Sequence, residues 1–140
     1  MGSEKIADLL KKARTIAVVG LSDKPDRPSY HIASYLLSVG YRVIPVNPRL
    51  KTIFNEKAYP DLLSIPNEIT VDIVDIFRRS EEVPPIVEQA IQKKPNCIWM
   101  QLGIINPEAA KKAESAGITV VMNQCISVVH QQLFGFGKTG

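Results

Sequence analysis

The chain has 140 residues, of which 45% are hydrophobic and 22% charged, and its formal net charge is +3. These values are typical of a globular protein, and we expect residues 1–140 to form a single domain. The positive charges form no block or stripe, which argues against a nucleic-acid partner, and no apolar run is long enough to span a membrane. Without a signal segment at the start, a cytoplasmic protein is expected.

In its first half the chain alternates between helix-like and strand-like segments. Apolar residues recur at helical spacing in two segments, and the continuous apolar run of residues 15–20 indicates a strand buried on both faces. The predicted elements, in chain order, are a helix over 4–13, a strand over 15–20, a helix from Pro28 that ends at Gly40, and a strand over 41–48 that stops at Pro48. Residues 50–66 are less regular and are expected to hold two short extended pieces and one helical turn.

The second half continues the same alternation. Ser80 and Asn106 stand where helix N-caps are expected, and Gly117 stands at a helix end. The predicted elements are strands over 70–77, 96–103 and 118–123, and helices over 81–93, 107–116 and 125–134. This order predicts parallel βαβ units, and so a Rossmann-like, doubly wound α/β sheet of five strands, in the order 3-2-1-4-5.

A ligand crevice is expected where the strand order reverses, at the carboxyl ends of the strands. Five segments follow strands and should meet at that edge: residues 20–29, 47–51, 77–80, 101–103 and 123–125. The topology therefore gathers the polar and charged loop residues of the chain at one site.

The loop after the first strand lacks the glycines of a dinucleotide-binding turn. That fingerprint needs three glycines and a later acid for the ribose, whereas Gly20 stands alone, with Ser22 and Pro25 at the other two positions and no acid after the second strand. Hydroxyls and cations can hold phosphates from further out, and a helix N-terminus near Pro28 would help. Basic residues recur around the same edge: Lys24, Arg27, Arg49, Lys51, Arg78 and Arg79. The sequence therefore predicts a ligand with more than one phosphate.

The stretch AVVGLSDKPDRPSYHIASYLLSVGYRVIPVNP, with the run G-x-S-x-K-x-x-R-P-S, resembles the small stand-alone CoA-binding proteins. These are similar to the CoA-binding domain of the succinyl-CoA synthetase α subunit. The later segments VDIFRRSEEVPPIVEQAI and WMQLGI agree with the same family in the same order, so the resemblance covers residues 11–134. The chain departs from the family where NQCISVVH replaces the common DRCxxxEH at residues 123–130.

The resemblance implies coenzyme A as the ligand and assigns parts of it to four segments. The phosphate loop would consist of Gly20, Ser22, Lys24, Arg27, Pro28 and Ser29. The adenosine and its 3′-phosphate would lie near Asn47, Pro48 and Arg49, with Lys51 beyond, and the third strand's end would add Ile76, Phe77 and Arg78. Gln101 and Gly103 would lie near the pantetheine path, as would Trp99. Alternatively, Phe77 and Trp99 are core residues and Asn47 caps a turn.

Catalytic groups are harder to find in the sequence. Cys97 and Cys125 form no CxxC motif and should be free thiols, and neither has metal-like spacing to His31 or His130, so no metal is expected. We therefore expect a non-catalytic module that binds CoA or an acyl-CoA, for binding alone or for regulation. A homodimer is compatible with this expectation. The alternatives are an enzyme acting on CoA thioesters or disulfides through Cys125, and an NADP-dependent oxidoreductase that uses Arg49 for the 2′-phosphate.

Overall fold

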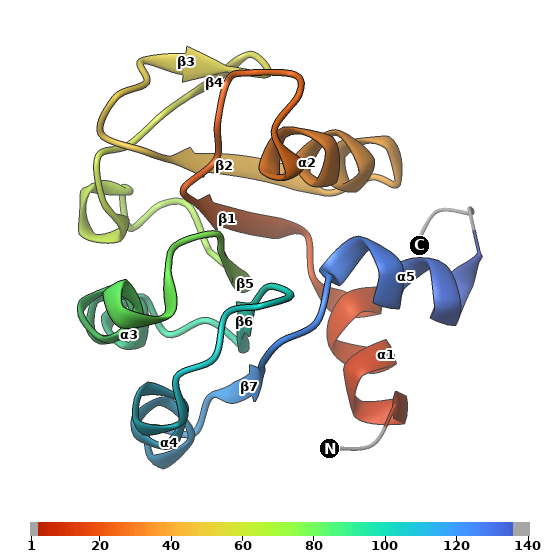
Figure 1. Ribbon diagram of the computed structural model, residues 1–140, viewed down its shortest axis with the longest axis vertical. Coiled ribbons are helices and arrows are strands. Elements are labelled where there is room, and N and C mark those ends of the chain that lie inside the picture. Colours follow the sequence, from red (N-terminus) through yellow and green to blue (C-terminus); the bar gives the residue numbers. More distant parts are fainter. Residues whose placement is uncertain (1–2, 136–140) are drawn as a thin grey trace.

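The computed structural model describes residues 3–135 as a parallel β-sheet with helices on both faces (Figure 1). The sheet contains β1 (Thr15–Val19), β2 (Arg42–Val46), β5 (Ile73–Ile76), β6 (Cys97–Met100) and β7 (Thr119–Val121). The helices are α1 (Ser3–Lys12), α2 (Pro28–Ser38), α3 (Val83–Lys93), α4 (Pro107–Ser115) and α5 (Ile126–Phe134). No helix in this part of the chain is long and apolar enough to cross a membrane.

The irregular segment between β2 and β5 holds the pieces that its sequence predicts. Two short strands, β3 (Thr52–Ile53) and β4 (Glu56–Lys57), form an antiparallel hairpin, and a 3-10 helix, η1 (Leu62–Ser64), follows. A second 3-10 helix, η2 (Ser80–Glu82), precedes α3. Ser80 is therefore not the cap of α3, and its hydroxyl instead accepts the Ile105 N–H at 2.9 Å.

The predicted doubly wound, parallel sheet of five strands is confirmed, with the order β2-β1-β5-β6-β7. Counted along the chain, this is 2-1-3-4-5, which differs from the predicted 3-2-1-4-5. The third sheet strand, β5, pairs with β1 instead of extending the sheet beyond β2. The order therefore reverses between β1 and β5.

The face on which each connection runs explains this order. A right-handed crossover on one face of a sheet moves the chain in one direction, and a crossover on the opposite face moves it back. Helix α2 packs on one face, whereas the connection from β2 to β5 places Leu62 and Ile65 in the core on the other. The chain therefore returns past β2 and β1, and the connections through α3 and α4 continue in that direction.

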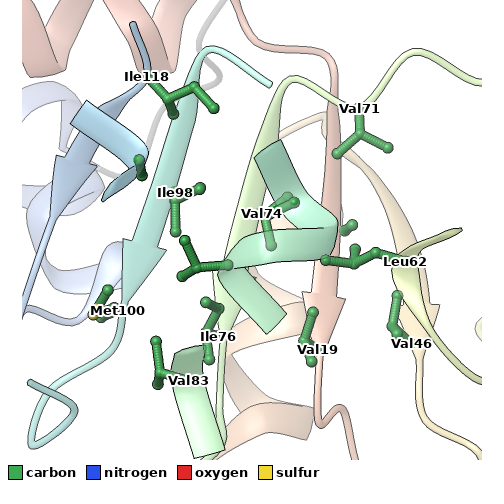
Figure 2. Close-up of a cluster of buried hydrophobic side chains, with 14 of the residues drawn as sticks. Val19, Val46, Leu62, Val71, Val74, Ile76, Val83, Ile98, Met100 and Ile118 are labelled. Carbon is green, nitrogen blue, oxygen red and sulfur yellow. The ribbon is translucent and has the colours of Figure 1, made fainter. Parts of the chain in front are cut away.

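Alternate residues of the strands fill two hydrophobic layers. Figure 2 shows the layer beneath α3, where Val19, Val74, Ile76 and Ile98 from three neighbouring strands meet Val83. The opposite layer lies beneath α1, α2 and α5. Because both faces are covered, the strands are apolar almost throughout, as the sequence predicts. An acidic residue, Asp75, nevertheless stands in the middle of β5 with no exposed surface.

Candidate functional site

The loops after β1 and β5 approach each other closely at the point where the strand order reverses. Gly20, the residue after β1, has φ +87°, and a Cβ added there would lie 2.6 Å from the carbonyl oxygen of Phe77. A side chain would therefore meet both the conformational penalty of the left-handed region and a clash with the backbone. The single glycine of this turn is required by the contact between the two loops.

Two cavities lie on either side of this contact, and Gly20 lines both. The first, the loop cavity, measures about 410 Å³. Its walls are Gly20, Ser22, Asp23, Lys24, Arg27, Pro28, Ser29, Asn47, Arg49, Leu50 and Phe77. The second, the apolar cavity, measures about 330 Å³, and its walls include Val46, Pro48, Leu62, Pro85, Ile86 and Arg78.

Hydrogen bonds within the protein hold the loop of residues 20–29 in place. The Ser29 hydroxyl accepts the N–H of Ser22 at 3.0 Å, and the Ser22 hydroxyl accepts the N–H of Lys24 at 3.1 Å. The Asn47 amide donates to the carbonyl oxygen of Leu21 at 2.9 Å and so ties this loop to the end of β2. Each serine hydroxyl accepts a bond here, and its own proton is not used in that bond.

The charges around the loop cavity favour an anion. Lys24, Arg27 and Arg49 are exposed, and within residues 3–135 none of them forms an ion pair. Helix α2 begins at Pro28, and no side chain caps its N-terminus. Free N–H groups at a helix N-terminus and nearby cations attract phosphates. Asp23 is the acidic residue among the walls of this cavity.

The basic residues after β5 are partly neutralised. Arg78 donates to Glu82 at 2.8 Å, and Arg79 pairs with the same carboxylate at 3.3 Å. The hydrogen bond from Arg78 is the main cause of the lowered pKa of Glu82. Arg78 lines the apolar cavity, whereas Arg79 and Lys51 line neither cavity. The six cations predicted at this edge therefore do not act together.

The remaining sequence-predicted residues lie outside both cavities. Ile76 is fully buried, and Trp99 belongs to the core beneath α5, where its indole donates to the carbonyl oxygen of Gln124 at 2.8 Å. Gln101 is buried and accepts the N–H of Ile126 at 3.1 Å, so it holds the start of α5. The N–H of Gly103 donates to the Asn123 side chain at 2.7 Å.

Several wall residues were not predicted from the sequence. Asp23 and Leu50 line the loop cavity, and Pro60, Pro85 and Ile86 line the apolar one. Asp23 and Leu50 are direct neighbours of predicted residues in the chain, so this adjacency could have indicated that they line the site. The residues of the apolar cavity come from the start of α3 and from the connection before η1, and only the strand order brings them beside Gly20.

The histidines stand apart from the crevice. His130 is buried, its Nδ1 lies 2.6 Å from the Tyr35 hydroxyl, and its ring contacts Tyr41 and Phe134. Burial lowers the pKa of His130. In the described part of the chain, no group of three or more His, Cys, Asp or Glu side chains is arranged to hold a metal ion.

Fold and site together define a Rossmann-like α/β protein with a cation-lined crevice at the switch point of its sheet. The chain belongs to the CoA-binding domain family, whose model matches residues 14–131. It is 40% identical over 126 residues to an uncharacterised protein of Bacillus subtilis, YneT, with 90% of this chain and 92% of that protein covered.

Comparison with solved structures and with enzymes extends this result. A structure from Thermus thermophilus superimposes with a TM-score of 0.91 at 38% identity, covering 96% of this chain and all of that one. An ADP-forming 4-hydroxybutyrate–CoA ligase of Nitrosopumilus maritimus is 30% identical over 129 residues, which are 84% of this chain but 18% of the ligase. The chain is thus similar to one part of a much longer enzyme.

Proposed function

We propose that this protein binds coenzyme A or an acyl-CoA in the crevice between the ends of β1, β2 and β5. The observation that carries the proposal is the loop cavity. Its walls bring together three cations without ion pairs and a helix N-terminus, in a chain that belongs to the CoA-binding domain family. CoA carries three phosphates, which suits this concentration of positive charge.

The two cavities suit different parts of that ligand. In our proposal the phosphates occupy the loop cavity, where Arg27 and Lys24 reach them from the loop and the N–H of Ser29 at the start of α2 supplies a donor. The adenosine passes Asn47 towards Pro48, and the apolar cavity, which Pro48 also lines, takes an uncharged part of the molecule. A purely polar crevice would not suit such a ligand, since CoA joins charged groups to an aromatic base and a long uncharged arm.

We further propose that the crevice binds its ligand without catalysing a reaction. Neither set of described wall residues contains a histidine or a cysteine. A nucleophile with an adjacent base is the usual requirement for acyl transfer. The chain is similar to a segment that makes up 18% of a CoA ligase. This similarity fits a part that holds CoA, while the chemistry of the longer enzyme requires further domains.

Calorimetry and thermal unfolding with CoA, acetyl-CoA, NADP and NAD test the proposal. At ~100 times the dissociation constant, CoA should stabilise the fold by about 2.7 kcal/mol. NAD and NADP at the same concentration should have much smaller effects, because the loop lacks the glycines that let a dinucleotide pyrophosphate approach. Equal stabilisation by NADP and CoA would refute the CoA assignment and favour the oxidoreductase alternative.

A further inference from the structure

A buried carboxyl group in the sheet has no hydrogen-bonding partner. Asp75 lies in the middle of β5 with no exposed surface, and neither of its carboxyl oxygens has a partner among the described residues. Its neighbours across the sheet are Val18 on β1 and Trp99 on β6. A buried ionised carboxylate without a partner is very costly, so burial raises the pKa of Asp75 well above its ordinary value.

Cys125, by contrast, is surrounded by groups that stabilise its anion. It is half-buried and is the residue immediately before α5, with its Sγ 3.2 Å from the Ser127 hydroxyl. Burial opposes ionisation of this thiol. The Ser127 hydroxyl, the N–H groups of Val128 and Ser127, and the Gln101 side chain outweigh burial, and the pKa of Cys125 is lowered. A thiol at a helix N-terminus with such donors has the surroundings of a reactive cysteine.

The sheet brings the Asp75 carboxyl and the Cys125 thiol to the same region of the fold. Trp99, the β6 partner of Asp75, donates its indole N–H to the carbonyl oxygen of Gln124 at 2.8 Å. Gln101, two residues further along, accepts the N–H of Ile126 at 3.1 Å. Both bonds hold residues 124–126 against the sheet face to which Asp75 points, since strand residues alternate between faces. The charge of a Cys125 thiolate accordingly acts on the Asp75 carboxyl.

We propose that Cys125 exchanges with the disulfide of a low-molecular-weight thiol, and that the Asp75–Cys125 pair carries one proton, on Asp75, and one negative charge, on the sulfur. The structure favours this distribution because the sulfur has hydrogen-bond donors and the carboxyl has none. Naming CoA disulfide as the first such disulfide rests on the proposed function. The exchange itself rests on the Asp75–Cys125 pair.

The step is a disulfide exchange. The Cys125 thiolate attacks one sulfur of RS–SR, a bond forms between the two sulfurs, and the original S–S bond breaks. The Cys125 sulfur is oxidised, and the leaving sulfur departs as RS⁻ with the bonding electron pair and takes a proton from solvent. A free thiol reverses the reaction by the same route. Asp75 keeps its proton throughout and so adds no second negative charge beside the attacking sulfur.

Intact-mass analysis and peptide mapping after incubation with CoA disulfide test the exchange. We expect one adduct per chain, on Cys125, that disappears on reduction and is absent from Cys125→Ser. Cys97 serves as a control within the same molecule, because burial raises its pKa to about 12. No adduct, or an adduct on Cys97, would overturn the proposal.

A second disulfide separates this inference from CoA binding. Cystamine carries no nucleotide, and the proposed function predicts that it modifies Cys125 more slowly than CoA disulfide at equal concentration. Equal rates would confirm an exchange site and remove CoA as its preferred ligand. Calorimetric binding of CoA without any adduct on Cys125 would leave the proposed function intact and refute the exchange.

The position of the proton is tested by the pH profile of Cys125 alkylation with iodoacetamide. The titratable groups that act on one another here are Asp75, Cys97 and Cys125. The midpoint should lie below the ~8.5 of a free cysteine and should stay unchanged in Asp75→Asn, because a neutral amide replaces a neutral acid. A midpoint that falls in Asp75→Asn would mean that Asp75 is the anion. An infrared band of a protonated carboxylic acid at neutral pH, measured on the unaltered protein, provides a check that needs no variant.

Discussion

Replacing Gly20 with alanine tests the contact on which the crevice depends. Gly20 and Gly103 have nearly the same backbone conformation, with φ +87° and +86°. A Cβ at Gly20 would lie 2.6 Å from the Phe77 carbonyl oxygen and 3.0 Å from Cδ of Arg78, whereas a Cβ at Gly103 would meet nothing within 4 Å. Gly103→Ala is therefore a matched control that carries the conformational penalty without the clash.

The magnitudes follow from these two contributions. An L-residue in the left-handed region costs about 1–2 kcal/mol, which is the whole expected effect of Gly103→Ala. Forcing apart two packed loops adds about 1–3 kcal/mol, as overpacking does elsewhere. Gly20→Ala should therefore lower the free energy of unfolding by roughly 2–5 kcal/mol in total. The Arg78 side chain can move aside, but the backbone of Phe77 is tied to β1 because its N–H donates to the carbonyl oxygen of Val19 at 2.8 Å.

Urea denaturation and thermal unfolding of the two variants and the unaltered protein measure the difference. For a chain of this length, 1 kcal/mol corresponds to about 4 °C in Tm, so Gly20→Ala should melt roughly 4–12 °C below Gly103→Ala. Both cavities have Gly20 in their walls, so CoA affinity should fall in Gly20→Ala as well. If the two variants were equally stable, the close approach of the loops after β1 and β5 would not be a constraint on this sequence.

Two further predictions concern charge. Arg27→Ala should weaken CoA by roughly 1.5–3 kcal/mol through the loss of charge-assisted bonds, while Arg79→Ala, which removes a cation outside both cavities, should leave the affinity measured by calorimetry unchanged. Equal losses of CoA affinity in the two variants would indicate a general electrostatic attraction of CoA to the protein and no specific contact with Arg27. Burial lowers the pKa of His130, so the unfolded state gains its proton first as the pH falls below ~6.5. The contribution of His130 to stability should be constant above that pH and decline below it by at most about 1.4 kcal/mol per pH unit. The difference between the unaltered protein and His130→Leu in urea titrations should show this part of the slope.

The element pattern of this fold could be predicted from local signals. Asn106 is a cap as expected, with its side-chain oxygen accepting the Ala109 N–H at 3.0 Å, because a short polar side chain directly before a proline at the first helical position favours this role. Apolar runs predicted the sheet strands because both faces are covered. Strand order is a different kind of information. Strand order depends on which face of the sheet the connection after β2 crosses. That connection contains no α-helix whose apolar residues would indicate the face on which it packs.

Part of the site follows from sequence and part does not, for related reasons. Ser22, Lys24, Arg27 and Ser29 are close in the chain and belong to one loop, so any fold that buries the first strand brings them together. Ion pairing is not visible in the same way. Glu82 neutralises Arg78 and Arg79 because the helical turn of η2 brings its carboxylate to the residues three and four positions earlier.

The strand order also decides which loop faces Gly20. In the order 3-2-1-4-5, the first strand would lie beside the strand that ends at Met100, and the crevice would lie between Gly20 and the residues that follow that strand. In the structure β5 lies between them, so Phe77 stands opposite Gly20. Gln101 is one strand further away, where its side chain holds the N-terminus of α5. The end of β6 lies beside Cys125 in either order, because β6 pairs with β7, and Gln101, which was expected to face the ligand, instead supports the thiol.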